Sequence, residues 1–205
     1  NAKFGAYIQN KSRFNVVTSA SGAYSSTISQ IRVTLQGNHV YGANATTGIV
    51  TTEGTVPIAV RVIDSRGREA NASYNRTVLA YSNPAISTFT ASRNEATETI
   101  VNFAMNFNVV TLGNANDKEY ILDYRQIAPS VSGWTTLINS TSYYTRNFTH
   151  DSGEVFVEDN TYEVRFRVSD YFTTATLIRT INPTFALFNY NESGRGFALG
   201  GLSTG

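Results

Sequence analysis

Two stretches of the chain alternate apolar and polar residues in the same way, and both contain an aspartate at the same place. They read "AVRVIDSRGRE" at 59–69 and "RFRVSDYFTTA" at 165–175. Aligning Asp64 with Asp170, an offset of 106 residues, also aligns the apolar positions Ile58, Val60 and Val62 with Val164, Phe166 and Val168. Alternation with period two is typical of a strand with one buried face. The shared parity predicts one structural unit used twice.

The rest of the chain follows the same pattern of short alternating strands separated by polar turns. Helical periodicity is nowhere sustained. Strands at intervals of about 8 to 12 residues, rich in aromatic and β-branched residues, indicate an all-β fold of two tandem immunoglobulin/fibronectin-like β-sandwich domains followed by a C-terminal β-hairpin. Pro84 favours extended geometry at Asn83, so a new unit is expected to start there. The predicted domains are 1–82, 83–182 and a hairpin segment at 183–205 that leads to a further region.

Local signals predict particular turns and irregularities. Asp64 at the first and Gly67 at the fourth position of "DSRG" suit a type I turn. A phase shift in the apolar positions near Ser29 predicts a bulge. The stretches "HVYGA" and "TGIVTT" are expected to form a short ribbon around "GANATTG". Tyr162 stands where a tyrosine corner occurs in such sandwiches, whereas its counterpart in the first half is Val56.

The closing stretch "PTFALFNYNESGRGFALGG" departs from this pattern and predicts a terminal hairpin. A lone two-stranded hairpin is marginal in water, so it is expected to pack on a neighbour. Replacing Gly194 or Gly196 by Val should destabilise its turn if that glycine has a positive φ.

Composition narrows the possible partners. Charged residues are 15% of the 205, against about 25% in an ordinary soluble domain, and the formal net charge is +1. Lys and Arg are scattered, which gives no electrostatic footprint for nucleic acid or an acidic membrane. There is no cysteine, so disulfides and thiolate metal sites are excluded. No apolar stretch approaches the roughly 20 residues of a membrane span.

Catalytic and metal-binding patterns are weak. His39 and His150 are isolated beside turns, and no HxxxH or HxH spacing exists. The carboxylates of Asp151, Glu154, Glu158 and Asp159 crowd one region, where solvated turn residues explain them better than a glycosidase pair. We therefore expect no enzymatic activity, no cofactor and no metal site.

One aromatic-rich stretch is a candidate saccharide platform. Tyr143 and Tyr144 lie in "SYYTRNF", and Trp134, the single tryptophan, is near in sequence. Aromatic rings with polar tips suit wet contacts with sugars. The alternative is ordinary alternation between core and surface on a sandwich strand, with Trp134 as a structural anchor.

Three stretches, "GAYIQNKSRFNVVTSASGAYSSTI", "VPIAVRVIDSRGREANASYNRTVLAYSNPAISTFTASR" and "PTFALFNYNESGRGFALGG", resemble the minor structural proteins and tail-fibre proteins of tailed bacteriophages that infect Gram-positive, streptococcal-type hosts. The resemblance implies a non-enzymatic role in the virion, in a tail fibre, tail tip or baseplate, acting outside the host cell. It implies other tail and baseplate proteins as partners, and leaves open contact with cell-wall or capsular polysaccharide and a homotrimer. No binding residues carry over from it.

Three function hypotheses follow. In the first, the chain is a structural and adhesion segment that spaces or presents receptor-binding regions toward saccharide on the host surface. In the second, it is a carbohydrate-binding module or bacterial surface adhesin that itself binds glycan. In the third, it is a wall-degrading enzyme.

Overall fold

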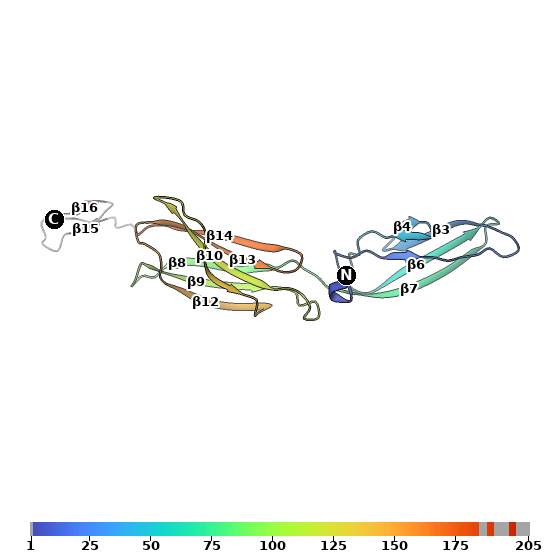
Figure 1. Ribbon diagram of the computed structural model, residues 1–205, viewed down its shortest axis with the longest axis horizontal. Coiled ribbons are helices and arrows are strands. Elements are labelled where there is room, and N and C mark those ends of the chain that lie inside the picture. The colour runs from blue at the N-terminus through green and yellow to red at the C-terminus, as the bar shows by residue number, and fades with distance from the viewer. Residues whose placement is uncertain (1, 185–187, 191–196, 200–205) are drawn as a thin grey trace. The chain divides into compact units, whose positions relative to one another are not determined.

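The protein is described by a computed structural model that covers residues 2–184, 188–190 and 197–199. The chain forms two compact units (Figure 1): the first comprises Asn1–Ser82 and Val110–Asn116, and the second comprises Asn83–Val109 and Asp117–Gly205. Strands dominate both units, as the alternating pattern predicts.

The first unit begins with a short 3-10 turn, η1 (Ala2–Phe4), and has two sheets. Its strands are β1 (Tyr7–Ile8), β2 (Asn15–Val17), β3 (Ile28–Leu35), β4 (Asn38–Tyr41), β5 (Asn44–Thr46), β6 (Gly54–Asp64) and β7 (Glu69–Leu79). The larger sheet has the order β1-β7-β6-β3-β4, and β2 pairs with β5 in the smaller one. The small sheet has only three residues in each strand, so it cannot cover the whole of the larger sheet.

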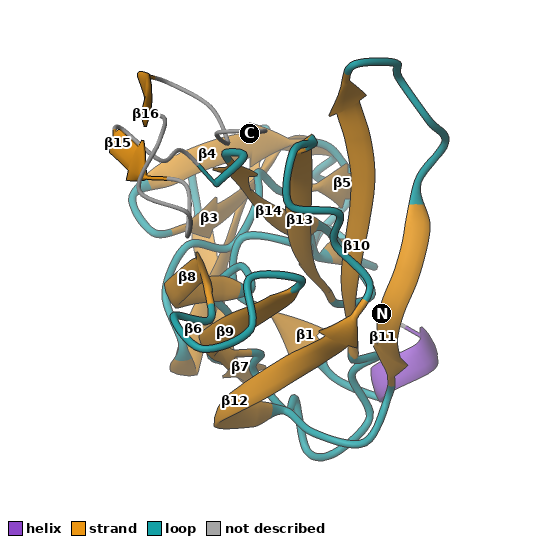
Figure 2. Ribbon diagram, turned by 90° about the vertical axis from the view of Figure 1, so that its left-hand side faces the viewer, coloured by secondary structure: helices purple, strands orange, loops and turns teal. Residues whose placement is uncertain are grey.

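The second unit is a seven-stranded sandwich with a further hairpin after it. Its strands are β8 (Ala85–Arg93), β9 (Ile100–Asn108), β10 (Glu119–Ala128), β11 (Thr135–Ser140), β12 (Thr145–Glu154), β13 (Thr161–Ser169), β14 (Thr174–Ile181), β15 (Phe188–Tyr190) and β16 (Phe197–Leu199). One sheet has the order β11-β10-β13-β14 and the other β12-β9-β8, with β11 outermost beside β10 (Figure 2). This arrangement of four and three antiparallel strands is that of a fibronectin-like sandwich.

The two repeated segments are β6 and β13, each of which lies inside its sheet between two partners. Ile58 and Val60 on β6 are 4% and 5% exposed, and Val164, Phe166 and Val168 on β13 are fully buried. The shared facing parity is confirmed. Both strands serve as a central strand of the larger sheet, which is why the same pattern occurs twice.

The cores of the two units differ in content. The first is small and mainly aliphatic: Phe14, Val33, Leu35, Ala45, Val50, Val56, Ile58, Val60 and Val78. The second is rich in aromatic rings: Phe89, Val101, Phe103, Met105, Phe107, Val109, Tyr120, Leu122, Phe156, Tyr162, Val164, Phe166, Val168 and Ile181. Since a buried aromatic side chain removes more apolar area from water than valine does, the second unit has the stronger packing contribution.

Several local predictions have clear outcomes. The register of β3 against β6 shifts between Ile28 and Gln30, which confirms the bulge at Ser29. The Tyr162 hydroxyl accepts a 3.0 Å hydrogen bond from the Val157 amide, five residues upstream, as a tyrosine corner requires. The terminal stretch pairs β15 with β16 as an antiparallel hairpin. Gly194 and Gly196 lie outside the described residues.

The expected ribbon between "HVYGA" and "TGIVTT" is wrong. Instead β4 pairs with β3, and β5 pairs with β2. Gln36 and Gly37, between Leu35 and Asn38, both have positive φ, 50° and 80°. Two central residues with positive φ form the tight turn that best matches the twist of a two-residue hairpin, so the chain reverses at Gln36 and not farther on.

Candidate functional site

The first unit has a groove of about 780 Å³ beside β6 and β7. Its floor includes Val60 and Val62, and Ala70, Ala72 and Tyr74 lie beside them on β7. The register pairs Ala70 with Val62, Ala72 with Val60 and Tyr74 with Ile58, so these β7 side chains share the inward face of the sheet.

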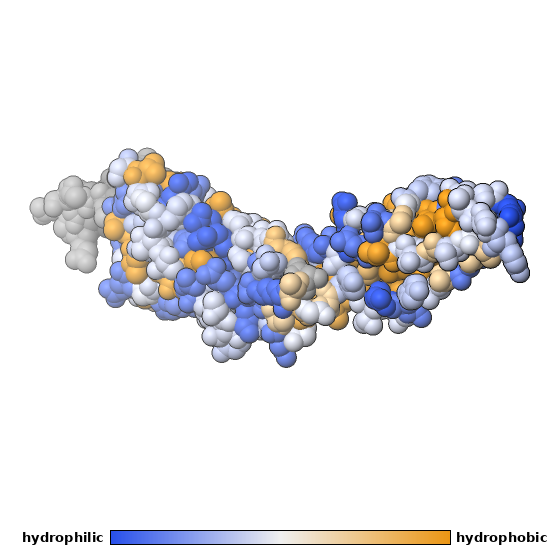
Figure 3. Space-filling model, turned by 45° about the vertical axis from the view of Figure 1, so that its right-hand side comes forward, coloured by the Kyte–Doolittle hydropathy of each residue, from blue (hydrophilic) through white to orange (hydrophobic). Residues whose placement is uncertain are grey.

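These inward β7 residues are nevertheless exposed, with Tyr74 at 54%. The short strands β2 and β5 stop before covering them. Figure 3 shows that apolar residues, in orange, reach the surface of the right-hand unit of the view among polar ones. The groove therefore offers an apolar floor beside a strand that no second layer covers.

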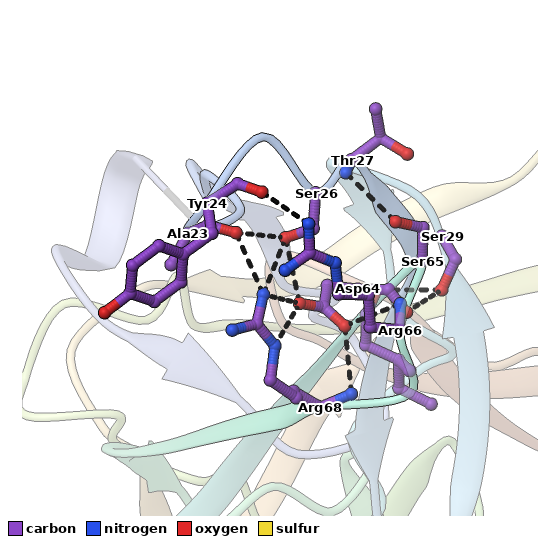
Figure 4. A network of polar contacts seen from close by, with 10 residues as sticks. Ala23, Tyr24, Ser26, Thr27, Ser29, Asp64, Ser65, Arg66 and Arg68 are labelled. Carbon is purple, nitrogen blue, oxygen red and sulfur yellow. Dashed lines mark hydrogen bonds and ion pairs between the residues drawn. The ribbon is translucent and has the colours of Figure 1, made fainter.

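One end of the groove is closed by a polar network centred on Asp64, which Figure 4 shows. Oδ1 of Asp64 accepts hydrogen bonds from the amides of Arg66 and Arg68, each at 2.9 Å. Oδ2 accepts from Arg68 Nε at 2.8 Å and lies 2.9 Å from Ser26 Oγ. Arg68 Nη2 also donates to the Ala23 carbonyl, at 2.9 Å, so the network ties the β6–β7 hairpin to the loop before β3.

The charge of Asp64 is stabilised by these contacts. Burial alone raises the pKa of a carboxyl group, but hydrogen bonds from the backbone and side chain of Arg68, the Ser26 hydroxyl and the Arg66 amide outweigh burial and hold the pKa of Asp64 below its usual value. The group stays ionised at neutral pH, which suits a structural anchor and not a proton donor.

The aspartate of the second repeat has a related role in a shorter turn. Asp170 Oδ1 accepts hydrogen bonds from the amides of Phe172 and Thr173, at 2.7 and 2.8 Å. In the first unit the Asp64 amide donates to the Arg68 carbonyl, whereas the Asp170 amide donates to the Thr173 carbonyl, one residue nearer. The repeated aspartate therefore caps two hairpins whose loops differ by one residue.

A second polar cluster lies on the outward side of β10 and β13 in the second unit. Asp123 is 1% exposed, and its Oδ2 accepts hydrogen bonds from Arg165 Nη2 at 2.8 Å and Arg167 Nη2 at 2.7 Å. The Thr136 hydroxyl donates to Oδ1 at 3.0 Å. Burial raises the pKa of Asp123, but these bonds, chiefly those from Arg165 and Arg167, hold it below its usual value.

Trp134 belongs to this cluster. It immediately precedes β11 and is half-buried. The guanidinium groups of Arg165 and Arg125 lie 4.0 and 4.7 Å from its ring centre, a cation–π arrangement that fixes the indole on the sheet. These contacts give Trp134 a clear packing role.

Tyr143 and Tyr144 lie after the opposite end of β11, which separates them from Trp134 by about 20 Å of extended chain. Tyr143 is 46% exposed, with the guanidinium of Arg146 4.7 Å from its ring centre. Tyr144 is half-buried under Lys118, whose Nζ is 3.9 Å from the ring centre. The two tyrosines are neighbours in the sequence, but each ring has a different cation beside it and neither lies near Trp134 along the chain. Sugar binding by any of the three stays a prediction.

The remaining candidates carry little chemistry. Asp151, Glu154, Glu158 and Asp159 are all exposed. His39 Nδ1 lies 3.0 Å from Thr34 Oγ1, and His150 stacks on Phe103. Within the described part of the chain, no three His, Cys, Asp or Glu side chains gather as metal ligands. Nor do the described residues include a helix with the length and apolar character of a membrane span.

Comparison with known proteins gives the family. Residues 3–200 match the family described as "Siphovirus protein of unknown function (DUF859)". The chain belongs to this siphovirus family. It is therefore a protein of a tailed bacteriophage, in agreement with the resemblance noted in its sequence, and the family points to a place in the virion. No curated protein matches it.

Two solved structures are similar to this siphovirus protein at a low level. One is dimeric latent PorU from Porphyromonas gingivalis, at 12% identity and a TM-score of 0.34, over 80% of this chain and 16% of PorU. The other is the fibronectin(III)-like modules of Clostridium thermocellum CbhA, at 11% identity and a TM-score of 0.31, over 87% of this chain and 88% of the modules.

Sequence reasoning missed the groove and the Asp123 cluster of the siphovirus protein. A signal for the groove existed in "EANASY", where Ala70 and Ala72 alternate with polar residues. Small residues at inward positions indicate a face without a tightly packed second layer. Asp123 gave no local signal, because its partners Arg165 and Arg167 are 42 and 44 residues away in the sequence.

Proposed function

We propose that this siphovirus protein is a non-enzymatic segment of a tail fibre or tail tip that spaces or presents receptor-binding regions toward saccharide on a Gram-positive, streptococcal-type host. The observation that carries the proposal is the use of consecutive β-sandwich units in a protein of a siphovirus family. Each sandwich has its own core, so such units can be joined in series without a shared active site.

The proposed partners are other tail and baseplate proteins, and the proposed place of action is the outside of the host cell. A homotrimer belongs to the same proposal. Sedimentation of the purified chain measures this directly, because a trimer has three times the mass of the 22.4 kDa chain.

Retention on purified host cell walls tests adhesion. The full chain is compared with a chain ending at Asn182, which keeps both sandwiches and removes the hairpin segment. Retention of both would place adhesion in the sandwiches, and retention of the full chain alone would place it after Asn182. If neither is retained above a non-adhesive β-sandwich protein, the adhesion part of the proposal is wrong and a spacer role remains.

The alternative, a module that itself binds glycan, draws support from the exposed ring of Tyr143 beside Arg146 and from Lys118 over Tyr144. An aromatic face flanked by donors suits a sugar ring and its hydroxyl groups. A glycan array with the wild type and Tyr143→Ala tests it, with Trp134→Ala as a comparison at the other end of β11. Silence of the wild type across bacterial wall and capsule glycans would exclude this alternative.

A further inference from the structure

Strand β7 leaves most of one edge without a partner. On one side it pairs with β6 from Glu69 to Val78. On the other side, within the described chain, it pairs only with β1, and only at Val78 and Leu79. The edge from Glu69 to Thr77 therefore has no strand partner among the described residues. Open edges of this length are templates for another strand.

The hairpin geometry shows which backbone groups face this open edge. The Asp64 amide donates to the Arg68 carbonyl at 3.0 Å, so that pair is hydrogen-bonded. In an antiparallel ladder, bonded and non-bonded pairs alternate. The amides and carbonyls of Ala70, Ala72 and Tyr74 therefore point to β6. Those of the intervening Asn71, Ser73 and Asn75 point outward, away from β6.

The groove lies under the same edge. Ala70 and Ala72 are small, inward and exposed, and Val60 and Val62 form the floor next to them. A strand added beside β7 would place every second side chain over this floor, since successive side chains alternate between faces. Apolar side chains at those positions would take the place of a missing second layer.

Charge at the far end of the groove indicates one more feature of the added strand. Arg76 is exposed and lines the groove on the inward face, opposite Val56. Its Nη1 donates to the Asn75 carbonyl at 3.1 Å, and it makes no ion pair among the described residues. A carboxylate on the added strand can pair with this guanidinium.

We propose that the first unit binds an extended polypeptide segment of a partner protein as an additional strand on the open edge of β7. The segment carries apolar side chains at alternate positions over Ala70 and Ala72 and a carboxylate facing Arg76. The segment would lie along the same edge of β7 as β1, which pairs there only with Val78 and Leu79. A polypeptide fits better than a glycan, because outward amides and carbonyls repeat along β7 with the spacing of another β-strand. This inference does not depend on host adhesion.

The test uses the full chain and a short peptide with uncharged, capped ends. Valine alternates with threonine along the peptide, and the groove-facing position next to Arg76 is glutamate. A control peptide has the same composition with its valines adjacent. Amide hydrogen exchange is followed by NMR. We expect the alternating peptide to slow exchange at Asn71, Ser73 and Asn75, while Ala70, Ala72 and Tyr74 are already protected by β6. The control peptide should leave all six unchanged.

Two variants sharpen the test. Ser73→Pro removes an outward amide that β6 does not use, and proline is tolerated at such edge positions. It should weaken peptide binding about tenfold, the effect of losing roughly one hydrogen bond. Ser73→Ala keeps the amide and should bind as the wild type does. An Arg76→Gln variant should weaken the glutamate peptide and leave unaffected a peptide with glutamine at that position.

Several outcomes would overturn the proposal. Equal binding of both peptides, or binding without protection of the outward amides, would rule out strand addition. Protection of those amides in the free protein that grows with concentration would assign the edge to a second copy of the chain. The groove would be assigned to glycan if the peptide does not bind and solubilised host-wall saccharide shifts the Val60 and Val62 resonances without protecting the outward amides.

Discussion

The Asp123 carboxylate is held by two guanidinium groups and a hydroxyl on the outward face of its sheet. Burial removes the hydration of this charge, and hydrogen bonds from the two arginines replace it. The same logic applies to Asp64, where one arginine, two amides and a serine surround the carboxylate. In a chain with few charged residues, these two groups connect segments that are distant in sequence.

Asp123→Asn should lower the free energy of unfolding of the second unit by about 3 kcal/mol at neutral pH, the lower end for a buried ion pair, because Arg165 and Arg167 are partly exposed. The folded-state pKa is depressed, so this stability is present above the unfolded pKa of about 3.9 and is lost as pH falls below it. Urea unfolding at neutral and acidic pH measures both effects. Asp159→Asn, at an exposed position, is the control; a stability difference between the wild type and the Asp123→Asn variant that persists unchanged into strong acid would contradict the assignment.

Tyr162→Phe tests the tyrosine corner. The substitution keeps the buried ring and leaves the Val157 amide without its hydroxyl acceptor. We expect a loss of about 1 kcal/mol in the second unit, the typical net value of one hydrogen bond. Chemical denaturation monitored by circular dichroism gives the value. Tyr143→Phe, whose ring is exposed, should have no effect, and equal losses in both variants would argue against the corner.

At the level of elements, the β6–β7 hairpin turn contains a glycine, Gly67, in the left-handed conformation that the turn requires. The Gly67 amide donates to the Asp64 carbonyl at 3.0 Å, and Gly67 has φ +78°. A type I turn followed by a left-handed residue is the usual three-residue hairpin loop. The predicted turn at "DSRG" is confirmed, and the loop fixes which β7 side chains face the groove.

Gly67→Ala should therefore destabilise the first unit by about 1 kcal/mol, the cost of a left-handed conformation for a residue with a Cβ. The Cβ itself would meet no atom within 4 Å, so the effect isolates backbone strain. Thermal melting of this variant is compared with Gly48→Ala, where space is equally open and φ is not positive. A melting temperature equal to that of the Gly48→Ala variant would contradict the strained turn.

Elements marked by residue types at short spacing could be predicted from the sequence. Features that depend on how far one sheet extends over another could not. The parity of β6 and β13, the Asp64 turn, the bulge at Ser29 and the role of Tyr162 follow from residue types at short spacing. The β3–β4 hairpin was missed because Gln36 has a positive φ without being glycine or asparagine. The groove depends on how far β2 and β5 extend over β7, which no single stretch of sequence records.

At the level of the whole molecule, each unit has a separate core, and no disulfide links any part of the chain. Two thermal transitions are expected in scanning calorimetry. Leu35→Ala should destabilise the first unit by about 3 kcal/mol and lower the temperature of its transition. Phe166→Ala should destabilise the second unit by about 4 kcal/mol and lower the temperature of the other transition, as buried large-to-small substitutions do. A single transition that both variants shift equally would show that the units unfold together.

The position of the lone indole has a practical consequence. Trp134 is the single tryptophan of the chain, and it rests against Arg165 and Arg125 on the second unit. Emission excited selectively at the red edge of its absorption band therefore reports on that sandwich alone, without any attached dye. The other sandwich stays optically silent under the same illumination, so the protein carries its own means of telling which half has opened.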